Sequence, residues 1–352
     1  MNSLFTPIRL RELNIRNRVW LPPMCQYHAT DGIPEDWHFV HYGARAAGGF
    51  GLIIAEATGI VPEGRISPAC TGLWNDEQEE AWSGIVSFVH AQGAAMGIQL
   101  NHAGRKASTV PWLPGRDPGT VREGGWETVG PSPIAQEGLD APRELTASEI
   151  EAVPGSFAAA AERAVRAGFD TVELHAAHGY LLHQFLTPLA NQRTDEWGGS
   201  FDNRTRLVRR VVRAVRDVLP SGMPLMVRLS ATDWIDGGWD LEQSVALASL
   251  LIDDGVDLLD VSTGGAAQAR IPVGPGYQVE FAAEIRRRSG LATAAVGMIT
   301  EPSQALSIVE GGDADAVLIG RAGLREPSWP QRAADETGAD IPYPDSYWRA
   351  KR

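Results

Sequence analysis

Eight short apolar segments recur along this chain at wide spacing, and this repetition limits the folds that the chain can adopt. Each segment is rich in Val, Ile, Leu or Ala and lacks the polar alternation of a half-exposed strand, as expected for strands covered on both faces of a parallel sheet. The segments are Val19–Leu21, Leu52–Ala55, Met96–Leu100, Thr171–Leu174, Leu225–Leu229, Leu258–Val261, Ala294–Val296 and Ala316–Ile319.

Helical stretches lie between these segments. They span Asn75–Gln92, Ala147–Ala167, Asp202–Val218, Leu241–Asp254, Gln278–Ser289 and Pro302–Glu310. Thr146 and Glu149 form a capping-box pattern, and Gly168 and Gly255 stand where a left-handed residue ends a helix. The alternation predicts an α/β fold, a (β/α)8 TIM barrel, as a single domain over residues 1–352. A doubly wound open sheet is the alternative, but its phosphate loop GxGxxG is missing after the first strand.

Residues 101–144 interrupt the alternation. This segment is rich in Pro, Gly and Trp and contains no recognisable helix. Loops of this length in compact domains are usually functional, and this one follows the third strand, where the C-terminal mouth of a barrel would lie. Trp112, Trp126, Pro131 and Pro133 favour an ordered segment. We therefore predict an inserted lid or capping loop, with a flexible surface insertion as the alternative.

The net charge and the cysteine content exclude several kinds of binding partner and cofactor. A net charge of -13 leaves no excess of Lys and Arg for nucleic acid or an anionic membrane, so we expect neither. Cys25 and Cys70 stand far apart in the chain and cannot build a disulfide framework or a four-cysteine iron–sulfur cluster. Residues 1–14 lack a signal-peptide pattern, and no apolar run approaches the roughly 18 residues of a membrane span. These features predict a cytoplasmic protein.

Glycines follow the last two predicted strands, at the positions where such barrels commonly bind phosphate. Gly297 and Gly320 would let backbone N–H groups approach an anion closely, and Arg321 could supply positive charge. Glycine also ends strands for conformational reasons alone, so this signal is weak by itself.

Two histidines and a tyrosine follow the fourth predicted strand. His175, His178 and Tyr180 could bind zinc, exchange protons or act as neutral hydrogen-bond donors. Zinc needs a third ligand, and only Glu173 is close, on the same face as His175 by strand alternation. We therefore expect no metal. The grouping favours a reaction site over a structural role for the histidines.

The segment His175–Arg204, HAAHGYLLHQFLTPLANQRTDEWGGSFDNR, resembles the longest shared motif of the Old Yellow Enzyme family of FMN-dependent ene-reductases. The resemblance extends from about Leu4 to Arg349. Pro22–Tyr27 is similar to a subgroup called thermophilic-like, in which a cysteine faces the flavin and a tyrosine lies nearby. Further matching motifs are Leu4–Pro7, Asn17–Arg18, Gly97–Leu100, His102–Lys106, Val296–Ile299 and Ile319–Arg321.

The resemblance implies reduction of an α,β-unsaturated carbonyl or nitro compound, with hydride passing from NADPH or NADH through FMN to the β-carbon. It implies that His175 and His178 bind the substrate oxygen and that Tyr180 protonates the α-carbon. Tyr27 would help to hold the substrate, and Cys25 would tune the flavin. The residues implied to hold FMN are Pro23, Met24, Cys25, Ala57, Gln99, Arg228, Gly297, Gly320 and Arg321.

The resemblance also implies a homodimer or homotetramer. Arg349, in a C-terminal tail over residues 340–352, is similar to a residue that the subgroup inserts into a neighbouring subunit's site, and Arg325 would lie near that boundary. The segment from Lys106 to Glu144 is longer than in compact members of the subgroup, which leaves the pocket size and substrate range open.

Other functions remain open at this level. The chain could be another TIM-barrel flavoprotein reductase, one acting on nitroesters or xenobiotics, although two cysteines disfavour types that carry an iron–sulfur cluster. A non-catalytic flavin-binding barrel would not need His175, His178 and Tyr180. The sequence shows no separate dinucleotide-binding domain, so it does not indicate whether NADPH or NADH is the preferred hydride donor.

Overall fold

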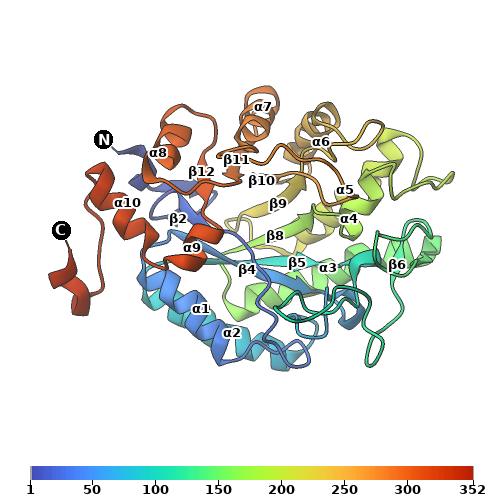
Figure 1. The fold of residues 1–352 in the computed structure, drawn as a ribbon, viewed down its shortest axis with the longest axis horizontal. Helices are drawn as coiled ribbons and strands as arrows, with labels where there is room; N and C mark the ends of the chain where they lie inside the picture. Colours follow the sequence, from blue (N-terminus) through green and yellow to red (C-terminus); the bar gives the residue numbers. More distant parts are fainter. Residues whose placement is uncertain (1, 352) are drawn as a thin grey trace.

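The computed structural model describes residues 2–351, and its central feature is a closed barrel of parallel strands (Figure 1). The strands adjoin in chain order, and the last, β12, pairs with the first, β3, to close the barrel. They are β3 (Val19–Leu21), β4 (Leu52–Gly59), β5 (Ala95–Asn101), β8 (Thr171–Ala176), β9 (Leu225–Ser230), β10 (Leu258–Ser262), β11 (Ala292–Val296) and β12 (Ala316–Leu318). The predicted (β/α)8 fold is confirmed, with one barrel strand for each apolar segment.

Helices surround the barrel on its outside (Figure 1). They are α1 (Asp36–Ala47), α2 (Asp76–Ala91), α3 (Ala147–Ala167), α4 (Leu181–Leu186), α5 (Phe201–Val218), α6 (Leu241–Asp253), α7 (Val279–Ser289), α8 (Pro302–Glu310), α9 (Arg321–Arg325) and α10 (Trp329–Thr337). The six predicted helices are present, each within one residue of its expected ends. Thr146 and Glu149 form the capping box of α3, which ends at the left-handed Gly168.

Four helices, α1, α4, α9 and α10, were not predicted. The start of α1 explains why, because its cap uses an unusual pair of residues. Glu35 stands at the N-cap, where Ser, Thr, Asp or Asn is usual, and His38 Nδ1, at the place of the capping-box Glu or Gln, accepts the Glu35 backbone N–H at 2.9 Å. Helices α4 and α9 are short, at 6 and 5 residues, and too brief to show helical periodicity.

The barrel interior has an apolar floor and a polar upper layer. Trp20, Met226 and Leu258 belong to the apolar cluster of the floor. The hairpin of β1 (Ile8–Leu10) and β2 (Leu13–Ile15) packs its Leu10 and Ile15 into the same cluster. Towards the carboxyl ends of the strands the buried side chains become polar, and they include Gln99, Glu173, Arg228 and Asp260. This gradient places reactive groups at the mouth of the barrel.

The segment between β5 and α3 forms little regular structure. It contains the short turn Gly104–Lys106 and the two-residue strands β6 (Val129–Gly130) and β7 (Arg143–Glu144), and it projects as loops beside β6 (Figure 1). Trp126 anchors it, because the indole N–H donates to the Glu63 carbonyl at 2.8 Å, whereas Trp112 is 82% exposed. Its role as a lid stays a prediction.

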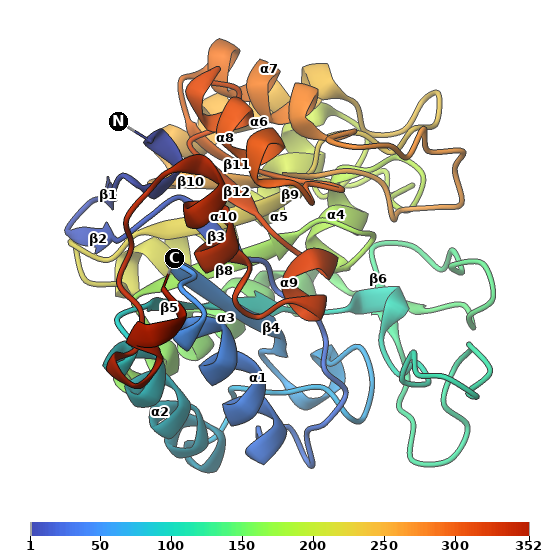
Figure 2. The ribbon, with the colours of Figure 1, turned by 60° about the vertical axis from the view of Figure 1, so that its left-hand side comes forward.

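The C-terminal tail lies on the opposite side of the molecule from that segment (Figure 2). It ends in the turn Asp345–Ala350, in which the Arg349 guanidinium lies 5.4 Å from the centre of the Trp348 ring. Entry of Arg349 into a neighbouring subunit concerns a second copy of the chain and stays a prediction. None of the helices formed by residues 2–351 is long and apolar enough to cross a membrane.

Candidate active site

Three predicted side chains meet at the carboxyl end of β8. The His175 ring centre lies 5.3 Å from that of His178 and 4.7 Å from that of Tyr180, both in edge-to-face orientation. His178 and Gly179 both adopt left-handed backbone conformations, with φ of 57° and 75°. This tight turn brings side chains on both sides of Gly179 back towards β8.

Side chains from β9, β10 and the turn Gly104–Lys106 form hydrogen bonds with His178. The Ser262 hydroxyl lies 2.7 Å from His178 Nε2, and Ser230 Oγ accepts the His178 backbone N–H at 3.0 Å. Lys106 Nζ donates to the His178 carbonyl at 2.7 Å. Ser262 and Lys106 follow predicted strands, so their position at the mouth was foreseeable, but nothing in the sequence shows which side chain they meet.

Both histidines are neutral at neutral pH. Burial, followed by the positive charge of Arg228, holds the pKa values of His175 and His178 well below the ordinary 6.5. Burial raises the pKa of Tyr180 well above 10, so the phenol keeps its proton. Lys106 has its pKa lowered by burial to about 8. The group therefore offers uncharged hydrogen-bonding atoms and one protonated phenol.

A buried cluster of charges lies inside the barrel next to the histidines. Arg228 pairs in register with His175 on one side and Asp260 on the other, and Gln99 donates to Glu173 at 2.8 Å. Arg228 Nε is 3.0 Å from Asp260 Oδ2, but the two are not aligned as a hydrogen bond, and neither has another such partner within residues 2–351. Burial raises the pKa of Asp260 to about 6. Such a cluster has unused capacity to bind a polar ligand.

Cys25 and Tyr27 pack with Tyr180 and Ala57 in a small cluster at the mouth. The two thiols, far apart in the chain, come into contact here: the hydrogen bond with Cys70, followed by burial, raises the pKa of Cys25 well above 9. Burial also raises the pKa of Tyr27. Cys25 is therefore an uncharged thiol, a feature that the separation of the cysteines in sequence did not reveal.

A cavity of about 300 Å³ opens at the ends of β10, β11 and β12. Ser262 lines it and contacts His178, so the cavity adjoins the three rings. Arg228, Gly297, Gly320 and Arg321 also line it, as the sequence analysis expected of a shared site. Tyr277, Gln278 and Thr300 line it as well, and they lie outside every motif quoted from the sequence.

A (β/α)8 barrel whose mouth joins a cavity at its last strands to neutral hydrogen-bonding rings suits an enzyme that binds a phosphate-bearing cofactor beside its substrate. The model of the NADH:flavin oxidoreductase / NADH oxidase family matches residues 3–339, and the chain belongs to this family. The resemblance to Old Yellow Enzyme is thereby confirmed. The chain is an NAD(P)H:flavin oxidoreductase that uses FMN and NAD(P)H.

Relatives and solved structures agree with this assignment. The NADPH dehydrogenase of Listeria monocytogenes is 46% identical over 99% of both chains, and that of Geobacillus thermodenitrificans is 45% identical over 100% of both. Morphinone reductase in complex with tetrahydroNAD has a TM-score of 0.78 at 32% identity, covering 97% of this chain and 93% of its own. The old yellow enzyme homologue from Zymomonas mobilis has a TM-score of 0.78 at 28% identity over 99% of both chains.

The cavity is suited to FMN. A Cβ added at Gly320 would meet only Pro22 Cγ at 3.6 Å and Met24 Sδ at 3.8 Å, so the protein leaves that space free next to Arg321. The incompletely partnered Arg228 stands at the other end, where a polar ring edge could satisfy it. In the described part of the chain, no group of three or more His, Cys, Asp or Glu side chains is placed to bind a metal ion.

Proposed function

We propose that this protein reduces activated carbon–carbon double bonds, with α,β-unsaturated carbonyl and nitro compounds as substrates. The observation that supports it is the meeting of three uncharged hydrogen-bonding rings, those of His175, His178 and Tyr180, beside the cavity. Transfer of hydride between NAD(P)H and the β-carbon of the alkene is the chemistry that FMN would supply when bound.

The cavity and the loop after β3 would hold FMN. Arg321, with backbone N–H groups at Gly297 and Gly320, suits the phosphate, and Arg228 would stabilise negative charge on the ring edge. Cys25, as a neutral thiol, would tune the ring. The remaining residues that we assign to FMN are Pro23, Met24, Ala57 and Gln99.

The two imidazoles would bind the activating oxygen of the substrate, together with Tyr27. His175 Nδ1 accepts the Ala177 N–H at 3.3 Å, which leaves the proton on Nε2 as a donor. The Ser262 hydroxyl is 2.7 Å from His178 Nε2 and 3.3 Å from Gln278 Oε1, and donation over the shorter contact would leave Nδ1–H as the free donor of the His178 ring. Two such donors stabilise negative charge that develops on the oxygen during reduction, as in an oxyanion hole.

Tyr180 would supply the proton to the α-carbon. Its raised pKa keeps the phenol protonated at neutral pH, and the Lys106 ammonium, 5.1 Å from the ring centre, favours the phenolate once the proton has left. The phenol is therefore both available as a general acid and stabilised after transfer.

Reconstitution tests the proposal. FMN-loaded protein should be yellow, lose its colour with NADPH or NADH in the absence of oxygen, and regain it with 2-cyclohexenone, N-methylmaleimide or a nitroalkene as the saturated product forms. A reduced protein that no activated alkene reoxidises would disprove ene-reduction but leave the oxidoreductase assignment intact. Rates with both nicotinamides would identify the preferred donor.

The tail and the inserted segment would complete the site in an assembly. We propose that Arg349 enters a neighbouring subunit of a homodimer or homotetramer and that residues 101–144 cap the mouth. Light scattering gives the oligomeric state, and Arg349→Ala should raise KM for the alkene without changing FMN binding. An unchanged KM in a stable oligomer would contradict this role.

A further inference from the structure

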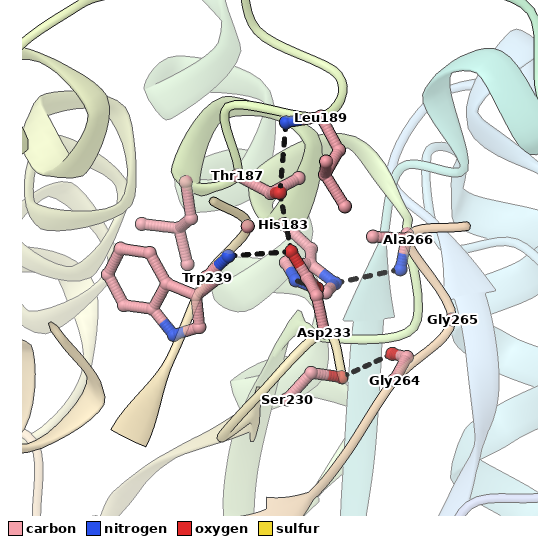
Figure 3. A network of polar contacts seen from close by, with 12 residues as sticks. His183, Thr187, Leu189, Ser230, Asp233, Trp239, Gly264, Gly265 and Ala266 are labelled. Carbon is pink, nitrogen blue, oxygen red and sulfur yellow. Dashed lines mark hydrogen bonds and ion pairs between the residues drawn. The ribbon is translucent and has the colours of Figure 1, made fainter. Parts of the chain in front are cut away.

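A buried imidazole and carboxylate lie beneath the turn that carries His178 and Tyr180. His183, on α4, and Asp233, in the loop after β9, both have fully buried side chains. His183 Nε2 lies 3.0 Å from Asp233 Oδ1, and Figure 3 shows the two side chains close together, with Gly264 and Gly265 to their right. Neither was selected from the sequence, in which His183 stands inside the long motif without an assigned role.

The other ring nitrogen of His183 faces the reaction site. His183 Nδ1 accepts the backbone N–H of Gly179 at 2.9 Å. Gly179 stands between His178 and Tyr180, so this bond holds the peptide that joins the two side chains. Its carbonyl is held as well, because Gln184 Nε2 donates to it at 2.8 Å.

These contacts fix the tautomer of His183. Because Nδ1 accepts a hydrogen bond, the proton of the neutral ring must be on Nε2, which faces the Asp233 carboxylate. Although Nε2 and Oδ1 are not aligned as an ideal hydrogen bond, Oδ1 has no hydrogen-bond partner elsewhere in residues 2–351. The Asp233 carboxylate therefore attracts the His183 Nε2–H electrostatically, without ideal hydrogen-bond geometry.

Asp233 is itself held in place and charged. Its Oδ2 accepts the Thr187 hydroxyl at 2.5 Å and the Trp239 backbone N–H at 2.8 Å (Figure 3). Burial by itself would raise the pKa of Asp233, but His183, Thr187 and Trp239 together lower it below the ordinary 3.8. A fixed negative charge therefore stands behind His183 over the whole neutral range.

The Gly179 turn leaves little room for any other arrangement. A Cβ at Gly179 would meet the Gly265 carbonyl oxygen at 2.2 Å, and one at Gly265 would meet His178 Cα at 2.5 Å. The two backbones are therefore in direct contact. A shift of the Gly179 peptide would displace His178 and Tyr180 relative to His175.

We propose that His183 is a positioning residue: through the Gly179 N–H it sets the places of His178 and Tyr180 relative to His175, and Asp233 keeps the imidazole in the tautomer that can accept this bond. The inference rests on the proposed ene-reduction, for which those rings must meet one substrate. A displacement on the order of 1 Å at such a site can reduce the rate about a hundredfold.

Two substitutions at one position separate positioning from packing. His183→Asn places an amide oxygen where Nδ1 was and can still accept the Gly179 N–H, whereas His183→Leu cannot. Neither side chain reaches Asp233, so both lose that contact equally. If either variant fails to fold, the same two are compared in an Asp233→Asn background, which removes the unpaired buried charge. His90→Leu, which breaks an exposed histidine–aspartate pair on α2, is the control.

The rate of reoxidation by 2-cyclohexenone should fall about tenfold to a hundredfold in His183→Leu. His183→Asn should recover most of that loss, although the two melt at similar temperatures, and His90→Leu should match the parent. Equal losses in the Leu and Asn variants would overturn the proposal, because only packing would then matter.

Hydrogen exchange at the Gly179 amide provides a readout that needs no turnover. Exchange should be at least about tenfold faster in His183→Leu than in His183→Asn, since only the former leaves this N–H without an acceptor. Equal exchange would also overturn the proposal. If the parent protein reduces no alkene but exchange differs as expected, ene-reduction fails while the positioning of the turn stands.

Discussion

The mouth of the barrel is built in two different ways on its two sides. The ends of β11 and β12 carry glycines in place of larger residues. Gly297 and Gly320 line a cavity there, and Arg321 is exposed at its rim. At the end of β8 it places buried and half-buried side chains that contact one another, and His178 is also held by the Ser262 hydroxyl. The first side is suited to hold an anion and the second to react, so binding and chemistry should respond to separate substitutions.

The largest expected effect lies on the β8 side. Tyr180→Phe removes the proposed general acid, and such groups contribute about a hundredfold to ten-thousandfold in rate. Reoxidation of the reduced protein by 2-cyclohexenone, followed by stopped flow, should slow by that factor while FMN affinity is unchanged. Val40→Ala, on the exposed face of α1, is the control. An undiminished rate would remove Tyr180 from the mechanism.

The next effect lies on the glycine side. Arg321→Met removes a cation from the cavity, and a hydrogen bond to a charged group contributes about 1.5–3 kcal/mol, or roughly tenfold to a hundredfold in affinity. FMN should bind that much more weakly by fluorescence titration, with kcat unchanged at saturating FMN. Arg287→Met, on the surface of α7, should have no effect. A fall in kcat with intact affinity would erase the distinction between the two sides.

The pH dependence of stability should also follow the β8 side. Unfolded histidines bind protons below about pH 6.5, whereas burial keeps folded His175 neutral until its lowered pKa. The free energy of unfolding should therefore fall as pH falls below about 6.5, by at most about 1.4 kcal/mol per pH unit for each such histidine. Above that pH the contribution is complete.

Thermal or urea unfolding between pH 7.5 and 5.5 would measure this slope. His175→Asn should make it shallower, whereas Arg321→Met should not change it. Asp260, with its pKa raised to about 6, contributes with the opposite sign but equally in all these proteins, so the comparison between variants isolates the histidine. A slope unchanged by His175→Asn would mean that folding does not shift the pKa of this ring.

The smallest expected effect concerns the thiol between the two sides. Cys25→Ala removes a weak S–H donor, worth about 0.5–1 kcal/mol, which converts to about 10–20 mV in a two-electron potential. The midpoint potential of bound FMN should become more negative by that amount, because the electron-rich reduced ring loses a donor. Cys70→Ser, which keeps a donor beside Cys25, should shift it less. A potential unchanged by Cys25→Ala would leave this residue a packing role alone.

Much of the mouth could be predicted because strand ends share one rim. Parallel strands bring their carboxyl ends to one rim, and His175 and Arg228, near the ends of β8 and β9, are register neighbours there. Glycines at the ends of β11 and β12 are visible in the sequence for the same reason. The apolar runs and helix caps that set this register are local signals, which a single sequence carries in full.

The partners of those residues could not be predicted. Asp260 meets Arg228, and Asp233 meets His183, through loop paths and strand stagger that no short segment determines. The contact of Cys25 with Cys70 depends likewise on how the loop after β4 folds back. Sequence thus locates the side chains that face a ligand better than those that support them.

The closure of the barrel determines when during synthesis the protein can bind its cofactor. Because β12 pairs with β3, the wall beside the cavity combines Met24, from the beginning of the chain, with Gly320, from near its end. A chain still emerging from the ribosome lacks one side of this wall until its last strand is free. Cofactor loading should therefore follow synthesis rather than accompany it, and nascent chains arrested before β12 should remain colourless.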